Sequence, residues 1–384
     1  MTEFTECYPY GVYASVRGHG EPRVCARVAE HVLDLADAAK RDGMAFDELE
    51  QPNLNKLLGA GRQVWRELGQ RVREWANDAP LIPIAEVELL LPFEVADYVD
   101  FYASEHHARN LGAILRPGQE PLQPNWRHQP VGYHGRAGTV VVSQTPVVRP
   151  VGHVAGVDGP VMWPTEKLDV EVEVGFVVGT PSQRGWSVGV DQFADHVFGI
   201  VLVNDWSARD IQAWETVPLG PFLGKSFQTS VSPWVVPLSA LEAARVPVAS
   251  SGTRLSSYLV ESSQPWGLDI ELELRVNGEL ISRPPYRTMH WSPAQMLAHL
   301  TVNGASIRTG DLYASGTVSG AGADEVGSLI ERWGGERFLA DGDEVVITAT
   351  ATAGHGSRLD LGEVRGRVGY PLRATTSMAA STWL

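Results

Sequence analysis

The sequence of 384 residues has little cysteine, no long apolar run and no excess of positive charge. Its two cysteines, Cys7 and Cys25, can form one disulfide at most, and neither lies in a motif that would make it a nucleophile. No segment approaches the roughly 20 consecutive apolar residues of a membrane span, and the acidic first residues lack the layout of a signal peptide. We therefore expect free thiols in a cytoplasmic protein that does not enter a membrane.

The charge balance limits the partners that the protein can have. Its 46 acidic and 31 basic residues give a net charge of −15. Such a surface repels phosphate backbones and anionic lipids, and the sequence contains no local basic cluster that would offset the repulsion. We expect no nucleic-acid partner. A small anionic substrate would need locally gathered Arg and Lys side chains or a bound cation.

The first part of the sequence combines short strand-like runs with one helical pattern. The segment VCARVAEHVLDL is typical of a hairpin strand and its partner. Between Leu54 and Trp75, apolar residues recur at helical spacing, which predicts one amphipathic helix. The segment NDAPLIPIAEVELLLP then leads out of an N-terminal unit of residues 1–93.

Residues 94–384 have a different character, with short strands separated by Gly, Pro and Ser. This pattern predicts a mostly antiparallel β body with a few helices, that is, an α+β fold that is mainly β, rather than regular alternation of strands and helices. The segments that carry the pattern are TVVVSQTPVVRP, LDVEVEVGFVVG, VFGIVLVND, LDIELELRVNGELI and DEVVITATA.

The clearest local signal is an alternation of apolar and acidic residues in LDVEVEVGF. On a strand, Glu171 and Glu173 lie on one face, about 7 Å apart at roughly 3.3 Å per residue. Two such carboxylates repel each other unless water or a cation separates them. A solvated strand face is the alternative interpretation of this pair taken alone.

Two further acids occupy unusual positions for a solvated side chain. Asp205 ends the apolar run VFGIVLVND, and Asp100 shares one side of the strand-like DYVDFY with Tyr102. Each could instead cap a following helix. If both converge with Glu171 and Glu173, four hard oxygen ligands make a site for Ca²⁺ or Mg²⁺ rather than for zinc.

A histidine pair follows Asp100 in the segment ASEHHARNLG. Ser104 can cap a helix here and place His107 at its third position, where the helix dipole disfavours the imidazolium form. A neutral ring of this kind can serve as a general base. His106 and His107 point about 100° apart on a helix, so that at most one of them faces a pocket. A structural or surface role is the alternative.

Three further polar residues lie downstream of Asp205. Arg209 and Gln212 are three apart and share one helix face in WSARDIQAWE, and Lys225 lies in a segment rich in Gly and Pro. They could donate hydrogen bonds to a developing oxyanion or enolate, or form ordinary surface pairs. The GKS at Lys225 lacks the upstream glycine of a phosphate loop.

At these residues the sequence resembles the fumarylacetoacetase family, over most of residues 97–335 and in the family's order. The strings VGYHGRA, NDWSARDIQ and PLGPFLGKS are more similar to fumarylacetoacetases than to the shorter decarboxylases, hydratases and acylpyruvases of the same catalytic fold. The start, YPYGVYASVRG, resembles the family's start. The matching segments are DYVDFYASEHHARNLG, LQPNWRHQPVGYHGRAGTVVVS, EKLDVEVEVGFVVG, VFGIVLVNDWSARDIQAWE, VPLGPFLGKSFQTSVSPWVVP, VNGASIRTGDLYASGTVSG and GSLIERWGG.

The resemblance implies a small SH3-like N-terminal barrel, a C-terminal β-roll of mixed sheets, and a homodimer. It also implies a hydrolase that cleaves a carbon–carbon bond of a small diketo acid, 4-fumarylacetoacetate, to give fumarate and acetoacetate. That reaction ends tyrosine and phenylalanine catabolism.

The resemblance further implies two bound cations, which would supply Lewis-acid chemistry and offset the acidic pocket. By matching positions, the Ca²⁺ ligands are Asp100, Glu171, Glu173 and Asp205. The Mg²⁺ ion would lie near Asp205, Lys225 and Thr229.

Catalytic and substrate positions follow in the same way. His107 matches the general base and Glu331, in GSLIERW, the carboxylate that orients it. Arg209, Gln212 and Lys225 would stabilise the leaving enolate. The positions that match substrate-holding residues are Tyr102, Arg116, Tyr133, Arg209, Gln212 and Thr317.

The sequence departs from the family pattern at two positions. Thr216 replaces a substrate-contacting Tyr, which leaves the acyl specificity open, and Gln228 replaces a Gly near the expected Mg²⁺ site. Rival interpretations are an acylpyruvase or β-keto acid decarboxylase, which would need no water-activating pair, and a metal-binding protein without catalysis. The presence of both His107 and Glu331 favours hydrolysis.

Overall fold

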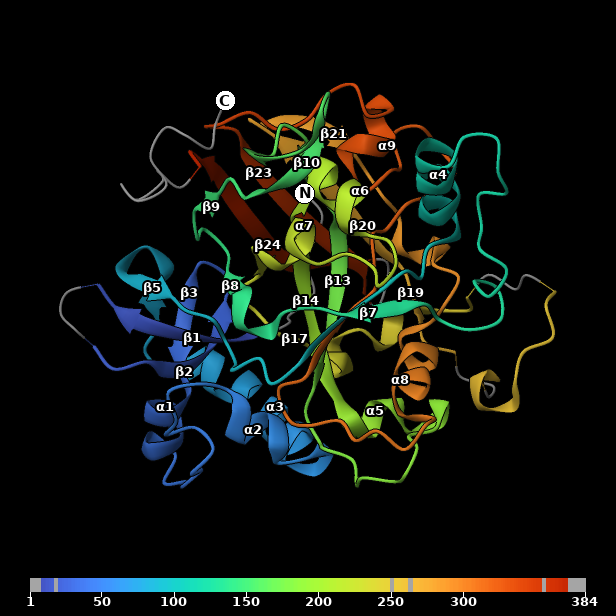
Figure 1. Cartoon of the computed structure of the whole chain (residues 1–384). Coiled ribbons are helices and arrows are strands. Elements are labelled where there is room, and N and C mark those ends of the chain that lie inside the picture. The colour runs from blue at the N-terminus through green and yellow to red at the C-terminus, as the bar shows by residue number, and fades with distance from the viewer. Residues whose placement is uncertain (1–7, 17–19, 249–251, 262–264, 354–356, 372–384) are drawn as a thin grey trace.

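The structure is a computed structural model that describes residues 8–16, 20–248, 252–261, 265–353 and 357–371. It is mostly strands with a few helices, which confirms the α+β class. An N-terminal sheet, a central mixed sheet and a C-terminal sheet form its body (Figure 1). None of the helices in these described ranges is both long and apolar enough to cross a bilayer.

The N-terminal part is a curled antiparallel sheet, a half-barrel, with strand order β4-β3-β2-β1-β5. The predicted hairpin of VCARVAEHVLDL is present, since β2 pairs with β3 in antiparallel register. The strands of this sheet are β1 (Tyr10–Ser15), β2 (Arg23–Val28), β3 (His31–Asp34), β4 (Ile82–Pro83) and β5 (Val87–Leu89). Its helices are α1 (Leu35–Arg41), α2 (Asn55–Gly59) and α3 (Arg62–Asp78).

The prediction of one helix between Leu54 and Trp75 was right in its periodicity and wrong in its continuity. Gly61 has a φ of 88°, a left-handed value that no helix interior accepts, and it separates α2 from α3. On α3 the buried residues Leu68, Val72 and Trp75 follow helical spacing. The spacing of apolar residues predicts which face of a helix is buried, but it does not show where one helix ends and another begins.

The central sheet has the order β7-β6-β22-β13-β14-β16-β8, and β17 also pairs with β14. Most of its pairs are antiparallel, while β22 with β6 and β16 with β8 are parallel. Its strands are β6 (Tyr98–Phe101), β7 (Gly132–His134), β8 (Val140–Val142), β13 (Val172–Val178), β14 (Val197–Asp205), β16 (Thr229–Val231), β17 (Val236–Pro237) and β22 (Leu312–Ala314).

The C-terminal sheet has the order β21-β20-β23-β24-β9, and short two-stranded pairs complete the β body. Its strands are β9 (Val147–Val148), β20 (Ile270–Val276), β21 (Glu279–Ser282), β23 (Glu344–Thr352) and β24 (Arg358–Gly369). The two-stranded pairs are β10 (Val151–Gly156) with β11 (Gly159–Pro164), β12 (Leu168–Asp169) with β15 (Ser207–Ala208), and β18 (Arg245–Val246) with β19 (Gly267–Leu268). The remaining α-helices are α4 (Glu105–Leu115), α5 (Phe193–His196), α6 (Arg209–Glu215), α7 (Leu223–Ser226), α8 (Pro293–Thr301) and α9 (Leu329–Trp333).

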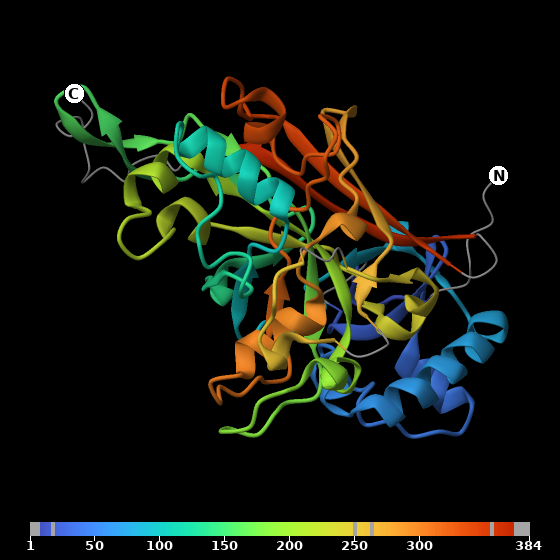
Figure 2. The ribbon, with the colours of Figure 1, turned by 90° about the vertical axis from the view of Figure 1, so that its right-hand side faces the viewer.

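Both faces of the central sheet are buried, which explains the continuous apolar run of β14. Ile200 and Leu202 pack into the core shared with the C-terminal sheet, whereas Val201 and Val203 pack into the core shared with the N-terminal helices. Figure 2 shows the N-terminal helices and the long C-terminal strands on different sides of this sheet. The acid at the end of β14 is therefore carried on a rigid, fully buried strand.

Asp34 gives a stability prediction in the N-terminal unit. Its carboxylate pairs with Arg23 and accepts a hydrogen bond from Asp37 N at 2.8 Å at the start of α1. Burial raises the pKa of Asp34, but Arg23 and the Asp37 amide lower it more, so that the net pKa is below the usual value. This stabilisation is complete above the unfolded pKa of about 3.9 and is lost as the pH falls through the lower folded pKa.

We therefore expect Asp34→Asn to lower the free energy of unfolding at pH 7 by about 1–3 kcal/mol, because a charged hydrogen-bond acceptor is lost. Urea unfolding of both proteins at pH 7 measures the difference. The difference in unfolding free energy should narrow as the pH falls from about 4 through the lower folded pKa of Asp34, since the wild-type carboxylate is protonated first in the unfolded chain and then in the folded protein. A gap that does not depend on pH would contradict the charge-based explanation.

Candidate metal centre and catalytic pair

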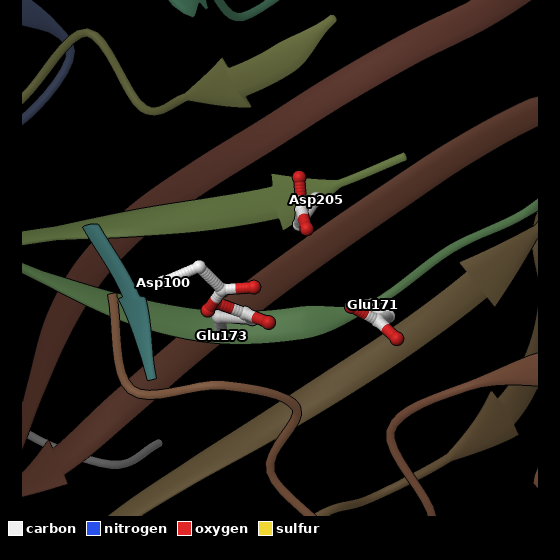
Figure 3. Close-up of side chains that lie close together, drawn as sticks. All are labelled: Asp100, Glu171, Glu173 and Asp205. Carbon is white, nitrogen blue, oxygen red and sulfur yellow. The ribbon is translucent and has the colours of Figure 1, made fainter. Parts of the chain in front are cut away.

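Four buried carboxylates meet at one end of the central sheet (Figure 3). Asp100 comes from β6, Glu173 from β13 and Asp205 from the end of β14, while Glu171 lies just before β13. One carboxylate oxygen of each lies within 4.8 Å of the others. The structure thus brings together all four of the acids that the sequence proposed as ligands.

The strand register explains this convergence. β13 and β14 are antiparallel, with Val172 opposite Asn204, so that the start of one strand meets the end of the other. Asp100 joins them through β22, where Ala314 pairs with both Asp100 and Gly175. The predicted strand over 168–176 is interrupted, because Glu171 forms only an isolated bridge with Ser328. Glu171 and Glu173 nevertheless reach the same cluster.

Two cationic side chains balance part of this negative charge. Lys225 Nζ donates to Glu171 and, at 2.6 Å, to Asp205 Oδ2. Arg209 Nη2 lies 2.8 Å from Glu171 Oε1. Burial raises the pKa of Glu171, but Lys225 and Arg209 lower it well below its usual value. Glu171 and Asp205 therefore have charged partners inside the protein.

Within the described part of the chain, the cationic partners at the cluster pair with Glu171 and Asp205 and not with Asp100 or Glu173. Both oxygens of Glu173 and Oδ1 of Asp100 are buried and have no hydrogen-bond partner among the described residues. Burial, together with the nearby carboxylates, raises the pKa of Asp100 and of Glu173 well above their usual values. Buried carboxylates without donors are costly unless protonated or bound to a cation.

This donor set fits a hard divalent cation. Four carboxylates supply oxygen ligands of the kind that Ca²⁺ and Mg²⁺ prefer. Lys225 and Arg209 carry two positive charges, which do not balance four ionised acids. The oxygens without a partner among the described residues belong to the other two acids, Asp100 and Glu173. A cation there would favour the ionised form of both.

A histidine–carboxylate pair lies beside the cluster. Ser104 caps α4 by accepting from His107 N at 3.2 Å, as the sequence predicted. His107 is buried, its Nδ1 lies 2.7 Å from Glu331 Oε2, and its Nε2 lies 3.9 Å from Glu171 Oε1. Burial raises the pKa of Glu331, but His107 and neighbouring donors lower it below its usual value. The Glu331 carboxylate is an acceptor for Nδ1, and Nε2 is the ring nitrogen that faces the carboxylate cluster.

Glu331 is itself held by several donors. They are Ser328 Oγ at 2.7 Å, Asn110 Nδ2 at 2.9 Å and Ser319 Oγ at 3.0 Å. Each acceptor direction of the carboxylate is therefore occupied, which fixes the orientation of the carboxylate toward His107.

Of the positions expected to hold substrate, Tyr102, Tyr133 and Arg209 contact this pair or cluster directly. The Tyr102 ring packs edge-on against His107, and Tyr133 Oη donates to Asp205 Oδ2 at 3.1 Å. Arg116 donates to Pro121 O through Nη2, while its Nε has no partner among the described residues. Thr317 Oγ1 is buried and likewise unpaired within the described ranges. Gln212 Oε1 accepts from Arg209 Nη1 at 3.2 Å, so the two share a face as predicted.

A cavity of about 150 Å³ adjoins the expected Mg²⁺ position. Its lining includes Tyr133, Asp205, Lys225 and Thr229, together with Tyr98. Thr229 Oγ1 donates to Asp205 Oδ1 at 2.9 Å, which draws these residues into one network.

The side chains at the two departures from the family pattern form hydrogen bonds to groups other than the four carboxylates. The Gln228 amide donates to Thr145 O and Ser230 Oγ, and Thr216 Oγ1 donates to Gln212 O at 2.6 Å. Neither side chain is among the partners of the four acids.

Sequence reasoning missed the residues that support the site. They are Asp169, Asn110, Ser319 and Ser328, whose partners are Arg209, Glu331 and helix α9. Asp169 carried a usable signal, since it belongs to the same alternation as Glu171 and Glu173. The serines and the asparagine gave none, because such residues are common in loops and helix caps.

Comparison with known proteins decides the family. The fumarylacetoacetate hydrolase C-terminal family model matches residues 97–369, and the fumarylacetoacetase N-terminal family model matches residues 7–92. The chain belongs to the fumarylacetoacetase family. The fumarylacetoacetase of Homo sapiens is 40% identical over 398 residues, covering 94% of each chain. That of Oryza sativa subsp. japonica is 39% identical over 401 residues, covering 94% of this chain and 93% of its own.

Solved structures show that the fold is shared more widely than the sequence. A fumarylacetoacetate hydrolase from Exiguobacterium antarcticum superposes with a TM-score of 0.60 at 18% identity, covering 94% of this chain and 99% of its own. A maleylpyruvate hydrolase from Sphingobium gives 0.55 at 15% identity, with coverage of 94% and 99%. At such identities the likeness supports the fold alone. The chain is thus a hydrolase of the fumarylacetoacetase family.

Proposed function

We propose that this enzyme hydrolyses a carbon–carbon bond of 4-fumarylacetoacetate, giving fumarate and acetoacetate, and so ends tyrosine and phenylalanine catabolism. One observation carries the proposal: His107, paired with Glu331 through Nδ1, presents Nε2 to the four-carboxylate cluster. The relatives at about 40% identity carry the name fumarylacetoacetase. An acylpyruvase or decarboxylase would need no such pair, so its presence favours hydrolysis.

The metal ligands we propose are the four clustered acids. Ca²⁺ would be held by Asp100, Glu171, Glu173 and Asp205, and Mg²⁺ near Asp205, Lys225 and Thr229. When bound, a divalent cation supplies Lewis-acid polarisation of carbonyl oxygens. The unpaired oxygens of Asp100 and Glu173 support this assignment.

The base step belongs to His107. Glu331 accepts the Nδ1 proton and so leaves Nε2 free to take a proton from water. The hydroxide then adds to the carbonyl carbon next to the scissile bond. Burial of both side chains keeps bulk water away from the proton transfer.

Cleavage of the carbon–carbon bond leaves its electron pair on the departing fragment as an enolate. Arg209, Gln212 and Lys225 would stabilise this charge, since the guanidinium and the ammonium are buried close to Glu171. The proton that His107 took from water is then delivered to the carbanion carbon, which gives the methyl ketone of acetoacetate, and the hydroxide oxygen remains in the carboxyl group of fumarate.

Substrate positioning would fall to groups around the pair. We assign Arg116, Tyr102 and Tyr133 to the distal carboxylate, and Thr317 to a further substrate oxygen. Nε of Arg116 and Oγ1 of Thr317 have no partner among the residues that the structure describes, and they are donors that a bound substrate could use. An unpaired buried donor costs stability that a ligand oxygen can recover.

We also propose domain limits of 1–93 and 94–384 and a cytoplasmic homodimer. Large apolar side chains exposed on and after α6 support self-association, since contiguous exposed apolar surface is typical of interfaces. They are Trp214, Val217, Leu219 and Phe222.

The proposed function is tested with purified enzyme and fumarylacetoacetate. Loss of the diketo chromophore in the ultraviolet should be rapid with Ca²⁺ or Mg²⁺. It should fall on the order of 100-fold or more after chelation, because the cation that would polarise the substrate carbonyl is then absent. Added Ca²⁺ or Mg²⁺ should restore turnover. An enzyme equally active in chelator, or one that leaves fumarylacetoacetate intact in the presence of both metals, would refute the proposal.

A further inference from the structure

Asp169 is a fully buried carboxylate. It is neither one of the four clustered acids nor part of the His107–Glu331 pair. It lies in β12, two residues before Glu171, and pairs across to Ser207 of β15. Its oxygens face two functional elements, Arg209 and the first turn of α9. A buried carboxylate needs donors for each oxygen, so its surroundings show what it holds in place.

The two oxygens of Asp169 divide four donors between them. Oδ1 accepts from Val170 N and Leu329 N, both at 2.8 Å. Oδ2 accepts from Arg209 Nε at 2.8 Å and from Ile330 N at 3.2 Å. The guanidinium and the start of α9 therefore share one acceptor.

These contacts fix the helix that carries Glu331. α9 spans only Leu329–Trp333. The side chain of its N-cap residue, Ser328, accepts no hydrogen bond from the first amides of the helix. The carboxylate of Asp169 takes that place from a distant strand, by accepting from the first two helical N–H groups. Glu331 is the next residue, so any shift of this turn moves the Glu331 carboxylate relative to His107.

The same carboxylate also aims Arg209. With Nε held by Asp169, the Nη2 end of the guanidinium points to Glu171 Oε1 at 2.8 Å. The pKa of Arg209 is raised, because Glu171 and Asp169 outweigh the effect of burial. Arg209 thus remains charged in a fixed orientation.

We propose that Asp169 is a positioning residue that sets Glu331 against His107 and Arg209 against the metal centre at the same time. This proposal rests on the proposed function, because it assigns His107, Glu331 and Arg209 to hydrolysis. The geometric part, that Asp169 holds the start of α9 and so the Glu331 carboxylate against His107 Nδ1, stands without any substrate.

Asp169→Asn tests this proposal with little change of shape. Whichever way the amide turns, two of the four donors face an NH₂ group instead of an acceptor. We expect kcat to fall about 100-fold with a smaller change in KM, in line with the loss of a group that orients a catalytic residue. Folding alone would not alter kcat in this selective way.

The second readout is the tautomer of His107, observed by ¹⁵N NMR of histidine-labelled enzyme with Ca²⁺ present. His107→Ala identifies the signal. Wild type should show the proton on Nδ1, and Asp169→Asn should show a mixture of both tautomers. Wild-type NMR behaviour of Asp169→Asn, or a kcat within about threefold of wild type, would overturn the proposal.

Asp34→Asn is the matched control, because Asp34 is also buried, pairs with an arginine and accepts from a helix amide. It should lower stability while kcat and the His107 signal remain those of wild type. If Asp169→Asn does not fold, Asp169→Glu is measured instead. It keeps the charge but displaces the oxygens, so that unchanged kcat and NMR signals would overturn the proposal.

The two proposals fail in different ways. If wild type does not cleave fumarylacetoacetate, the proposed function fails while the NMR comparison still decides the role of Asp169. If wild type is active and Asp169→Asn behaves like wild type, only the role of Asp169 is refuted.

Discussion

His107→Ala is expected to reduce kcat for fumarylacetoacetate on the order of 10³-fold or more, since a positioned general base contributes about 10²–10⁴-fold. Nε2 of His107 faces the carboxylate cluster, and Glu331 holds the ring through Nδ1. Alanine removes the proton acceptor and leaves all four carboxylates in place. Ca²⁺ affinity, measured by calorimetric titration, should therefore change little.

His106→Ala supplies the matched control for this experiment. The two histidines are neighbours on α4, but only His107 is buried toward Glu331, while His106 lies partly exposed. The His106 variant should keep wild-type kcat and KM. Normal turnover by His107→Ala, or an equal loss in both variants, would remove His107 from the role of base.

Glu173→Gln is expected to preserve or raise the melting temperature of the metal-free enzyme and to weaken Ca²⁺ binding. Both Glu173 oxygens are buried without a donor among the described residues, so the metal-free protein carries a carboxyl group that resists ionisation. A neutral amide at this position should leave the melting temperature in chelator unchanged or higher, because no charge must be buried. With Ca²⁺ present, the variant loses an anionic ligand.

We expect the Ca²⁺ affinity of Glu173→Gln to fall about 100-fold or more. Loss of a residue that only supports a metal ligand already lowers metal affinity about 10–100-fold. The gain in melting temperature that wild type shows on adding Ca²⁺ should shrink accordingly. Glu279→Gln is the control, since Glu279 is exposed on β21 and its loss removes the same charge. Unchanged Ca²⁺ affinity in Glu173→Gln would show that the ion, if any, binds elsewhere.

Much of the local structure followed from the residues alone. The apolar run ending in Asp205 gave a buried strand, and Ser104 gave a helix start with His107 at its third position. These features depend on a few neighbouring side chains, so sequence patterns report them well. The break at Gly61 was missed because helical spacing continues on both sides of it.

The sequence by itself determined which residues can bind a cation or a proton, and in what order they lie on strands and helices. Only the tertiary structure decided that Oδ1 of Asp100 and both oxygens of Glu173 have no donor among the described residues, that Lys225 reaches Glu171, and that Asp169 links α9 to Arg209. The physical reason is the separation along the chain over which each interaction acts. Periodicity and capping act over a few residues, whereas the charge balance of a buried site depends on strand register between segments far apart in the chain.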